Sequence, residues 1–360
     1  MTEPERSIEA ISQRLHTFLL EKSSAEFGDE AAILFAAAAA AASGGKRLRA
    51  RFCLAGWQAA RNTDLSVATQ DRSVVTAAAA LELFHAAALV HDDLIDNSDT
   101  RRGKPSAHRA LASAHQNALW AGNSHAFGRS AAILLGDLLV AWSDDLFEQA
   151  LEGSAHAANA RGEYANMRSE VTIGQFLDVA EESAYRVAPD DTHADRALRI
   201  AALKSARYSV ARPLAIGAAL AGAAAEQQDA LAEFAHPLGI AFQLRDDVLG
   251  VFGNPAETGK PSGDDLREGK RTVLVAFARE GISTSARRIF DEMLGDPQLT
   301  PDQIGSLQRT IADSGALQRV EDVIASSARQ ADQALTRSEL GAAAVADLRA
   351  LCTAATVRVA

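Results

Sequence analysis

The chain has 360 residues, 48% of them hydrophobic and 23% charged, which is ordinary for a soluble globular protein with a large core. Its formal net charge of −11 argues against non-specific binding to nucleic acid, because such binding needs a basic face. Small anionic substrates are not excluded, since a few Lys and Arg residues and metal ions can reverse the local field inside a cleft.

The cysteines and the N-terminal segment bear on the cellular compartment. Cys53 and Cys352 lie far apart and lack metal-ligand spacing, so neither a disulfide framework nor a zinc site is indicated, and a reducing cytosol fits. Residues 1–15 carry charges where a signal peptide needs its apolar centre. The apolar run 31–42 is too short and too rich in alanine to cross a bilayer. We therefore expect a cytoplasmic protein without a membrane span.

Helical periodicity is the main local signal along the chain. Alanine is abundant, aromatic residues make up only 5%, and there are 9 prolines, a composition that favours helices over strands. Spacings of three and four residues begin with Ile8, Ile11, Leu15 and Leu19. Further helices are expected within residues 131–151, 171–179, 197–220, 231–249 and 304–359. Residues 112–129 are predicted to be a flexible connection. With no alternating strands and no linker, we predict one all-α domain over residues 1–360.

The first charged motif is Gly44-Gly45-Lys46-Arg47-Leu48-Arg49. Lys46 and Arg49 are predicted at a helix start, where free N–H groups also favour anions. An arginine fork matches diphosphate oxygens, and lysine supplies a compact cation. The alternative is a solvated charged surface.

The first acidic motif, HDDLID (91–96), follows an almost wholly apolar stretch. On a helix Asp92 and Asp96 lie about 6 Å apart along the axis and share a face. Two such carboxylates repel each other unless a cation or water lies between them, and magnesium commonly binds one or two carboxylates plus substrate phosphates. His85 shares this stripe, as a buried core histidine or as part of the site. A solvated helix end is the other interpretation, which the apolar lead-in disfavours.

Three later segments add cations and a second acidic motif. Arg101-Arg102-Gly103 follows the first acidic motif, and Lys204 is a lone cation on an apolar helix, where it either extends along the surface to water or serves a site. FQLRDD (242–247) repeats the acidic helix end, so two helices could face each other across a cleft and hold several metal ions.

Residues 250–269 form a Gly-, Pro- and Asp-rich stretch that is predicted to be a loop. It is not a P-loop, because one residue too many separates Gly253 from Lys260 and Pro261 replaces the Ser or Thr that would bind magnesium. Lys260 and Lys270 on this stretch suit a phosphate-closing lid, and a solvated surface loop is the alternative.

Taken together and in this order, the segments resemble the trans-isoprenyl diphosphate synthase (polyprenyl synthetase) family. The matching motifs are GGKRLR (44–49), LELFHAAALVHDDLIDNSDTRRG (81–103), GQFLD (174–178), KSA (204–206), FQLRDD (242–247) and GKPSGDDLREGKRT (259–272). The match covers about residues 44–272 and leaves 273–360 as C-terminal helices. The resemblance implies an all-α, single-domain helical bundle of the isoprenoid synthase type with a central active-site cavity. It also implies a homodimer that joins isopentenyl diphosphate to an allylic diphosphate with three Mg²⁺ ions per active site.

The resemblance further implies roles for single residues. The direct magnesium ligands would be Asp92, Asp96 and Asp246, assisted by Asp93 and Asp247. Isopentenyl diphosphate would bind Lys46, Arg49, His85 and Arg102. The allylic diphosphate would bind Arg101, Lys204 and Lys260, with Lys270 and Gln243 nearby. Catalysis is assigned to Asp92, Asp96, Asp246, Lys204 and Arg101. Gly250 stands where the family's second acidic motif often ends in Asp, and we expect it to weaken support around the metal rather than abolish activity.

Product length is expected to depend on the residues that precede Asp92. Ala87 and Ala88 are small where family members that stop at fifteen carbons usually carry bulky aromatic residues. Phe84, about 12 Å from Asp92 along a helix, would then form the floor of the product tunnel. We predict geranylgeranyl diphosphate, with longer polyprenyl products as the alternative. A non-catalytic partner subunit should have lost acids or cations, and a terpene cyclase would have no use for the basic motif at 44–49.

Overall fold

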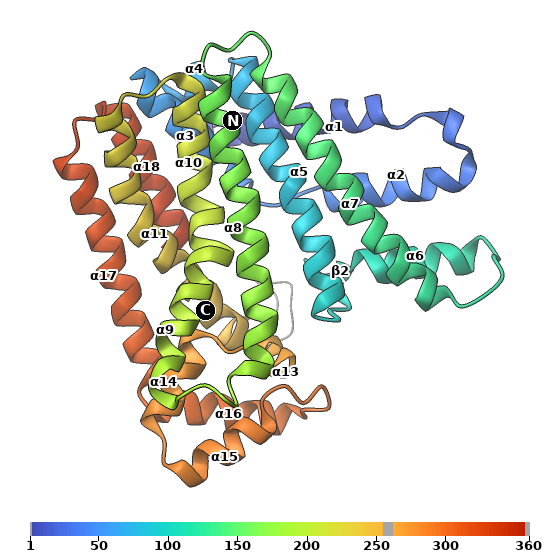
Figure 1. Cartoon of the computed structure of the whole chain (residues 1–360), viewed down its shortest axis with the longest axis vertical. Coiled ribbons are helices and arrows are strands. Elements are labelled where there is room, and N and C mark those ends of the chain that lie inside the picture. The colour runs from blue at the N-terminus through green and yellow to red at the C-terminus, as the bar shows by residue number, and fades with distance from the viewer. Residues whose placement is uncertain (1, 255–261, 357–360) are drawn as a thin grey trace. The chain divides into compact units, whose positions relative to one another are not determined.

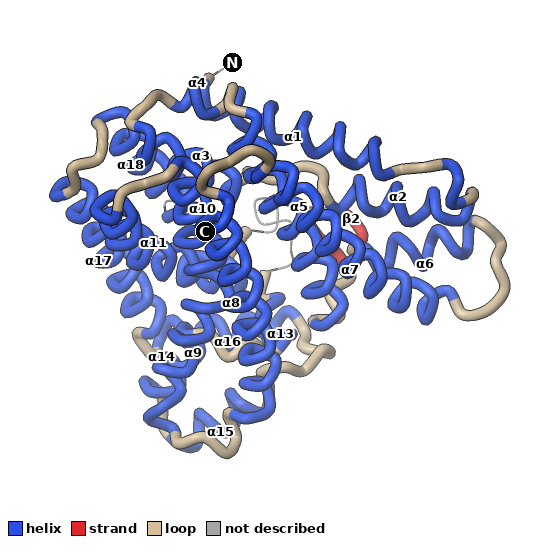
Figure 2. Tube along the Cα trace, turned by 45° about the horizontal axis from the view of Figure 1, so that its top comes forward, coloured by secondary structure: helices blue, strands red, loops and turns tan. Residues whose placement is uncertain are grey.

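The computed structural model describes residues 2–254 and 262–356, which are almost entirely helical (Figures 1 and 2). The first half of the chain contains α1 (Glu3–Lys22), η1 (Ala25–Phe27), α2 (Asp29–Ala41), α3 (Leu48–Arg61), α4 (Leu65–Ala68), α5 (Arg72–Ile95), β1 (Thr100–Arg101), β2 (Lys104–Pro105), α6 (Ala107–Asn117), α7 (Ser124–Leu151) and α8 (Ala157–Ala184). The second half contains η2 (Asp190–Thr192), α9 (His193–Ala201), η3 (Ala202–Ala211), α10 (Arg212–Ala221), α11 (Ala225–Phe252), α13 (Asp264–Glu268), α14 (Val273–Gly281), α15 (Thr284–Met293), α16 (Pro301–Asp313), α17 (Ala316–Arg337) and α18 (Ala342–Thr356). The all-α prediction is confirmed.

The chain divides into two compact units. Unit 1 comprises Met1–Ala160 and Ile216–Ala223, and unit 2 comprises Arg161–Ala215 and Ala224–Ala360. In unit 1, α5 packs against α7, α3 and α1, and Figure 1 shows α5 beside α7. In unit 2, α11 packs against α17, η3 and α18. One long apolar helix therefore forms the centre of each unit. That residues 1–360 act as one domain stays a prediction.

The central helix of unit 1, α5, is apolar on nearly every side. Asp71 caps its N-terminus by accepting hydrogen bonds from the backbone N–H groups of Ser73 and Val74 at 2.9 and 3.1 Å. Leu81 and Leu83 are fully buried, as expected for a helix that is hydrophobic all round. The helix ends at Ile95. Its last turn is polar and carries the acidic motif at the edge of the apolar core.

The core of unit 2 fixes the short helix α13. Leu244, Val248 and Val251 of α11 belong to one buried cluster with Leu266 of α13. Residues of α14, α16 and α17 complete this cluster, among them Val273, Ile304 and Val320. The end of α11 that carries the second acidic motif is thus packed tightly against α13.

The predicted flexible connection at 112–129 is wrong. Residues 107–117 form α6, and α7 already begins at Ser124, capped by the Asn123 side chain, which accepts from the Ala126 N–H at 3.0 Å. The reason is a buried stripe on α6 made by His108, Leu111 and His115. The prediction of helices within residues 131–151, 171–179, 197–220 and 231–249 is confirmed, as is that for 304–359 up to Thr356, the last described residue.

Two helices, α5 and α7, are long and apolar enough to cross a membrane by length and composition alone. The most apolar stretch of α5 is 78% buried within the protein, and that of α7 is 39% buried. A core helix of a globular protein passes the same test, and the burial of α5 is typical of such a helix.

Candidate active site

The first acidic cluster lies at the end of α5 in unit 1 and already contains a cation. Arg101 donates from Nε to Asp93 Oδ1 at 2.8 Å, and its Nη2 also bonds Asp93. The same Nη2 lies 3.4 Å from Asp92 Oδ2. Asp93 is only 2% exposed. Of Asp92 and Asp93, the carboxylate that was expected only to assist is therefore the one more closely bonded to Arg101. Asp96 caps the C-terminus of α5 one turn after Asp92.

A two-stranded hairpin places Arg101 in this cluster. β1 pairs with β2 in antiparallel register, Arg101 opposite Lys104. Arg102 and Gly103 form the turn with left-handed backbone at both positions, φ 53° and 71°, as tight hairpins prefer. The hairpin therefore turns Arg101 back toward α5 and leaves Arg102 at its tip.

The tip residue Arg102 meets the first charged motif. Its Nη1 donates to the carbonyl oxygen of Ser43 at 3.1 Å. A Cβ atom at Gly45 would lie 2.8 Å from Arg102 Nη2, and Gly45 has a φ of +87° that side chains rarely adopt. Gly45 therefore makes room for this guanidinium group, which brings the two basic motifs of unit 1 together.

Helix α3 begins at Leu48, so Lys46 is not on the helix start where we expected it. Lys46 is exposed in the preceding loop, and Arg47 adopts a left-handed backbone there, φ 49°. Arg47 is 7% exposed and donates to the Ala42 carbonyl at 2.7 Å. Glu82 of α5 lies 3.5 Å from Arg47 and accepts from the Ala50 N–H at 3.1 Å. Arg47 and Glu82, which the sequence did not single out, thus fasten the basic motif to α5.

His85 lies near several arginine side chains of unit 1. Burial lowers the pKa of its imidazole well below the usual range, and nearby guanidinium groups lower it further. These groups belong, in decreasing order of effect, to Arg49, Arg102, Arg101 and Arg47. His85 is therefore neutral at pH 7, and its surroundings are strongly electropositive, as a diphosphate requires.

The residues predicted to control product length lie on α5 one to two turns before Asp92. Ala87 is fully buried, Ala88 is partly buried, and Phe84 is 6% exposed. The small side chains of Ala87 and Ala88 thus lie close to the acidic cluster, and the bulky side chain of Phe84, one turn earlier on α5, is buried.

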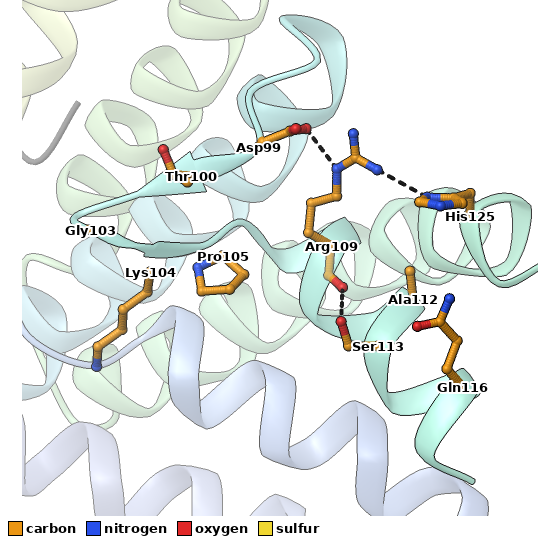
Figure 3. A pocket seen from close by; sticks show the side chains of 10 residues that line it. All are labelled: Asp99, Thr100, Gly103, Lys104, Pro105, Arg109, Ala112, Ser113, Gln116 and His125. Carbon is orange, nitrogen blue, oxygen red and sulfur yellow. Dashed lines mark hydrogen bonds and ion pairs between the residues drawn. The ribbon is translucent and has the colours of Figure 1, made fainter. Parts of the chain in front are cut away.

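Figure 3 shows a pocket of unit 1 that is bordered by the hairpin, α6 and α7. Its volume is about 320 Å³. Arg109 donates from Nε to Asp99 Oδ1 at 2.6 Å and from Nη1 to His125 Nδ1 at 2.9 Å. None of its ten lining residues belongs to the predicted site. The guanidinium group of Arg109 at its centre is thus already bonded to two side chains.

The second acidic cluster lies at the end of α11 in unit 2. Asp247 is 5% exposed and accepts a hydrogen bond of 2.6 Å from Gln243 Nε2. Burial raises the pKa of Asp247 to about 8, and the nearby carboxylates of Asp265, Asp246 and Asp178 raise it too, against the opposing hydrogen bond from Gln243. Four carboxylates from α8, α11 and α13 are therefore near enough to interact electrostatically.

Lys204 supplies the cation of this cluster. Its Nζ lies 2.5 Å from Asp178 Oδ2. Lys204 belongs to η3, a π-helix, and such segments are rare and frequently found at functional sites. Gly174 of α8 permits the approach, because a Cβ there would lie 2.4 Å from the Lys204 backbone nitrogen. Asp178 and the π-helix were not predicted, although Asp178 ends the GQFLD motif.

Lys270 lies beside the same group of acids. Its Nζ is 2.7 Å from Glu268 Oε2 and 3.9 Å from Asp265 Oδ1. The stretch 250–269 is less irregular than expected, because α11 continues to Phe252 and α13 occupies Asp264–Glu268. Lys260, the other lysine predicted here, falls outside the described residues.

Known proteins resemble this chain in both sequence and fold. Residues 31–311 match the polyprenyl synthetase family. A short chain isoprenyl diphosphate synthase of Methanocaldococcus jannaschii is 29% identical over 297 residues, 82% of this chain and 79% of that protein. A geranylfarnesyl diphosphate synthase of Aeropyrum pernix is 33% identical over 281 residues, 77% of this chain and 79% of that protein.

Among solved structures, the fold is similar to that of the geranylgeranyl pyrophosphate synthase of Corynebacterium glutamicum, complexed with isoprenyl diphosphate and magnesium. The two chains are 36% identical, each covered over 100% of its length, with a TM-score of 0.92. The chain is a member of the polyprenyl synthetase family.

Proposed function

We propose that the chain is a magnesium-dependent prenyltransferase that joins an allylic diphosphate to isopentenyl diphosphate, releases pyrophosphate and makes mainly geranylgeranyl diphosphate. The observation that carries the proposal is that each unit pairs a carboxylate cluster with a cation. Arg101 contacts Asp92 and Asp93, and Lys204 contacts Asp178. Family membership and the magnesium and isoprenyl diphosphate in the Corynebacterium structure support it.

The donor set suits magnesium. We assign Asp92, Asp96 and Asp246 as its ligands, since Mg²⁺ takes oxygen ligands and is usually held by one or two carboxylates plus substrate phosphates. Among the described residues, no three His, Cys, Asp or Glu side chains are grouped closely enough to hold a metal ion by themselves. The proposed ion would therefore draw its other ligands from phosphate and water. When bound, magnesium, proposed as three ions, would neutralise charge on the leaving diphosphate.

The residues of the chain would bind and stabilise the other charges. Arg101, Lys204 and Lys270 would hold the allylic diphosphate and stabilise the negative charge that develops as its carbon–oxygen bond breaks. Lys260 and Gln243 are assigned to the same substrate. The double bond of isopentenyl diphosphate attacks the allylic carbon, the bonding electron pair leaves with the diphosphate, and that diphosphate takes up the proton released from the product.

Isopentenyl diphosphate is assigned to the electropositive part of unit 1. Arg49 and Arg102 supply fork-shaped cations, and Lys46 supplies a mobile one from the exposed loop. The neutral imidazole of His85 can donate a hydrogen bond without adding a charge. This division leaves the carboxylate-bound cations for the leaving group.

Product length is assigned to Phe84 as the floor, with Ala87 and Ala88 leaving space above it. Geranylgeranyl diphosphate is proposed because the floor lies about two helical turns beyond the acidic cluster. A longer product is the alternative, and the name of the Aeropyrum relative shows that such products occur among similar chains.

The test is a product-sizing assay. Purified protein is incubated with labelled isopentenyl diphosphate and dimethylallyl, geranyl or farnesyl diphosphate, with Mg²⁺ or with EDTA, and the dephosphorylated products are separated by chromatography. We expect geranylgeraniol with Mg²⁺ and none with EDTA. No product from any primer would favour a non-catalytic subunit, a cyclic hydrocarbon formed without isopentenyl diphosphate would favour a terpene cyclase, and mainly farnesol would refute the product length.

Whether both clusters serve one reaction is tested by a double-mutant cycle. Asp92→Ala should lower turnover by roughly 10²–10³-fold, by analogy with the loss of other electrostatic stabilisers, and Asp246→Ala is expected to do the same. The double variant should lose much less than the product of the two effects, because residues that act as a unit are not additive. Fully multiplicative losses would show that the two carboxylates act independently and would contradict one cooperative magnesium-diphosphate site. The proposed homodimer is checked separately by sedimentation equilibrium of the full chain.

A further inference from the structure

We propose that Gly250 and Asp265 form a matched pair, in which the missing side chain at position 250 lets the Asp265 carboxylate rest on α11 and complete the second acidic cluster. The third carboxylate of this cluster would then come from α13 instead of from α11. This inference rests on the proposed function, because it assigns a positioning role within the same magnesium-diphosphate site.

The geometry at Gly250 is the first support. A Cβ atom there would lie 1.9 Å from Asp265 Oδ2, 2.4 Å from its Cγ and 2.9 Å from its Oδ1. Ordinary contacts of a Cβ atom are 3.4–4 Å, so the whole carboxylate group occupies the space that a side chain would need. Gly250 also follows Asp246 by one helical turn, which puts both positions on one face of α11. The Asp265 carboxylate therefore reaches the stripe on which a third acid of the motif would lie.

The second support is that α13 cannot easily retreat from α11. Leu266 is fully buried in the core of unit 2, and its carbonyl accepts from the Gly295 N–H at 2.9 Å. Gln308 connects α11 with the residues that precede α13 in the chain. Its Nε2 donates to the Val251 carbonyl of α11 at 2.6 Å and to Ser262 Oγ at 3.1 Å. A side chain at position 250 would thus push the Asp265 carboxylate aside rather than move the helix.

The charges around Asp265 give the third support. The Asp265 carboxylate rests against Gly250, one helical turn after Asp246 on α11, which places it within the cluster. Lys270 Nζ lies 3.9 Å from Asp265 Oδ1. Asp265 therefore connects the acids of α11 with a cation that the proposed function assigns to the diphosphate.

The pairing makes a prediction opposite to simple restoration of the family motif. Gly250→Asp adds the missing acid, yet it should impair the site, because the new side chain and Asp265 compete for one space. Asp265→Ala should impair it by removing the carboxylate. The double variant, with Asp at 250 and Ala at 265, should recover most of the loss, since one carboxylate again fills one space.

The experiment measures the Mg²⁺ concentration that gives half-maximal effect in two ways, for the full chain and each variant. One readout is turnover with geranyl and isopentenyl diphosphates. The other is the rise in melting temperature with Mg²⁺ and inorganic pyrophosphate, which needs no turnover. We expect each single variant to require about ten-fold more Mg²⁺ in both readouts, the typical loss when a supporting residue of a metal site is changed, and the double variant to require less than either.

Two controls and the outcomes complete the test. Gly250→Ala should behave like Asp265→Ala, whereas Gly162→Ala, a helical glycine of α8 with nothing within 4 Å of its Cβ, should match the wild type. A double variant no better than the single ones, or an unimpaired Gly250→Asp, would overturn the pairing. If Gly250→Asp does not fold, recovery of folding in the double variant supports the pairing and continued failure overturns it. If the wild type shows neither turnover nor a shift with Mg²⁺ and pyrophosphate, the proposed function itself fails.

Discussion

Replacing Gly174 by alanine would test how closely α8 and η3 must approach for the Lys204–Asp178 pair to form. Gly174 lies one turn before Asp178, and a Cβ there would be 2.4 Å from the Lys204 backbone nitrogen and 2.7 Å from its Cα. Ordinary contact begins at 3.4 Å, so the two segments would have to separate by the difference, 1.0 Å. The clash is with main-chain atoms, so no flexible side chain can relieve it.

The expected magnitudes follow from this displacement. Overpacking of a close contact costs about 1–3 kcal/mol, and replacing a glycine within a helix by alanine returns about 0.5–1 kcal/mol. The net loss in the free energy of unfolding should be about 1 kcal/mol, within limits of about 0 and 2.5 kcal/mol. A shift of this size at Lys204 should also lower turnover by up to roughly 10²-fold, because small misplacements of charged groups weaken transition-state contacts.

Urea unfolding and steady-state turnover measure the two effects, with Gly162→Ala as the matched control. Gly162 lies on the same helix, and nothing is within 4 Å of its Cβ, so the control should be slightly stabilised and fully active. The result that refutes the reasoning is a Gly174→Ala protein as stable and as active as the Gly162→Ala protein. A stable but inactive Gly174→Ala protein would instead show that Lys204 moves at little cost to packing.

Three other predictions concern α5 and the cysteines. Phe84→Ala should lengthen the product, as product chromatography would show, and an unchanged product would remove Phe84 as the floor. The pKa of His85 is lower in the folded protein than in the unfolded chain. Below about pH 6.5 the unfolded chain therefore binds the proton first. The free energy of unfolding then falls with decreasing pH by up to about 1.4 kcal/mol per pH unit. His85→Gln should flatten this slope in urea unfolding between pH 6.5 and 5, and an unaltered slope would assign it to other groups. Burial raises the pKa of Cys53 to about 12, and it also raises the pKa of Cys352. Iodoacetamide should therefore spare Cys53 and slowly modify Cys352 in the native protein. Modified Cys53 in the native protein, detected by mass spectrometry, would contradict its burial.

The helices could be predicted where apolar residues carry the period. The expected stretches 131–151 and 231–249 lie within α7 and α11 because Leu, Ile and Phe mark the buried face. The stretch 112–129 failed for the opposite reason. On α6 the buried stripe consists of His108, Leu111, Ala112 and His115, at the spacing of a helix, but two of its four members are histidines, which count as polar.

The candidate site could be predicted as a set of motifs but not as a set of contacts. Sequence spacing placed Asp92 and Asp96 on one stripe, since Asp92 lies in the last turn of α5 and Asp96 caps that turn. It could not pair Lys204 with Asp178 or Arg47 with Glu82, because those partners lie 26 and 35 residues apart and meet only through tertiary packing. The π-helix that carries Lys204 is equally a product of packing, and no local pattern signals it.

Three of the cations assigned to the diphosphate are already bonded to carboxylates: Arg101 to Asp93, Lys204 to Asp178 and Lys270 to Glu268. Each pair keeps its cation oriented and relieves the repulsion among clustered acids. Under the proposed function, Asp93 can turn toward a metal ion only as Arg101 turns toward phosphate, because a buried charge without a partner is costly. Metal without diphosphate would leave the guanidinium group unpaired, and diphosphate without metal would leave the carboxylate unpaired. Under the proposed function, magnesium and diphosphate would therefore strengthen each other's binding, and the ion pairs would be the origin of that coupling.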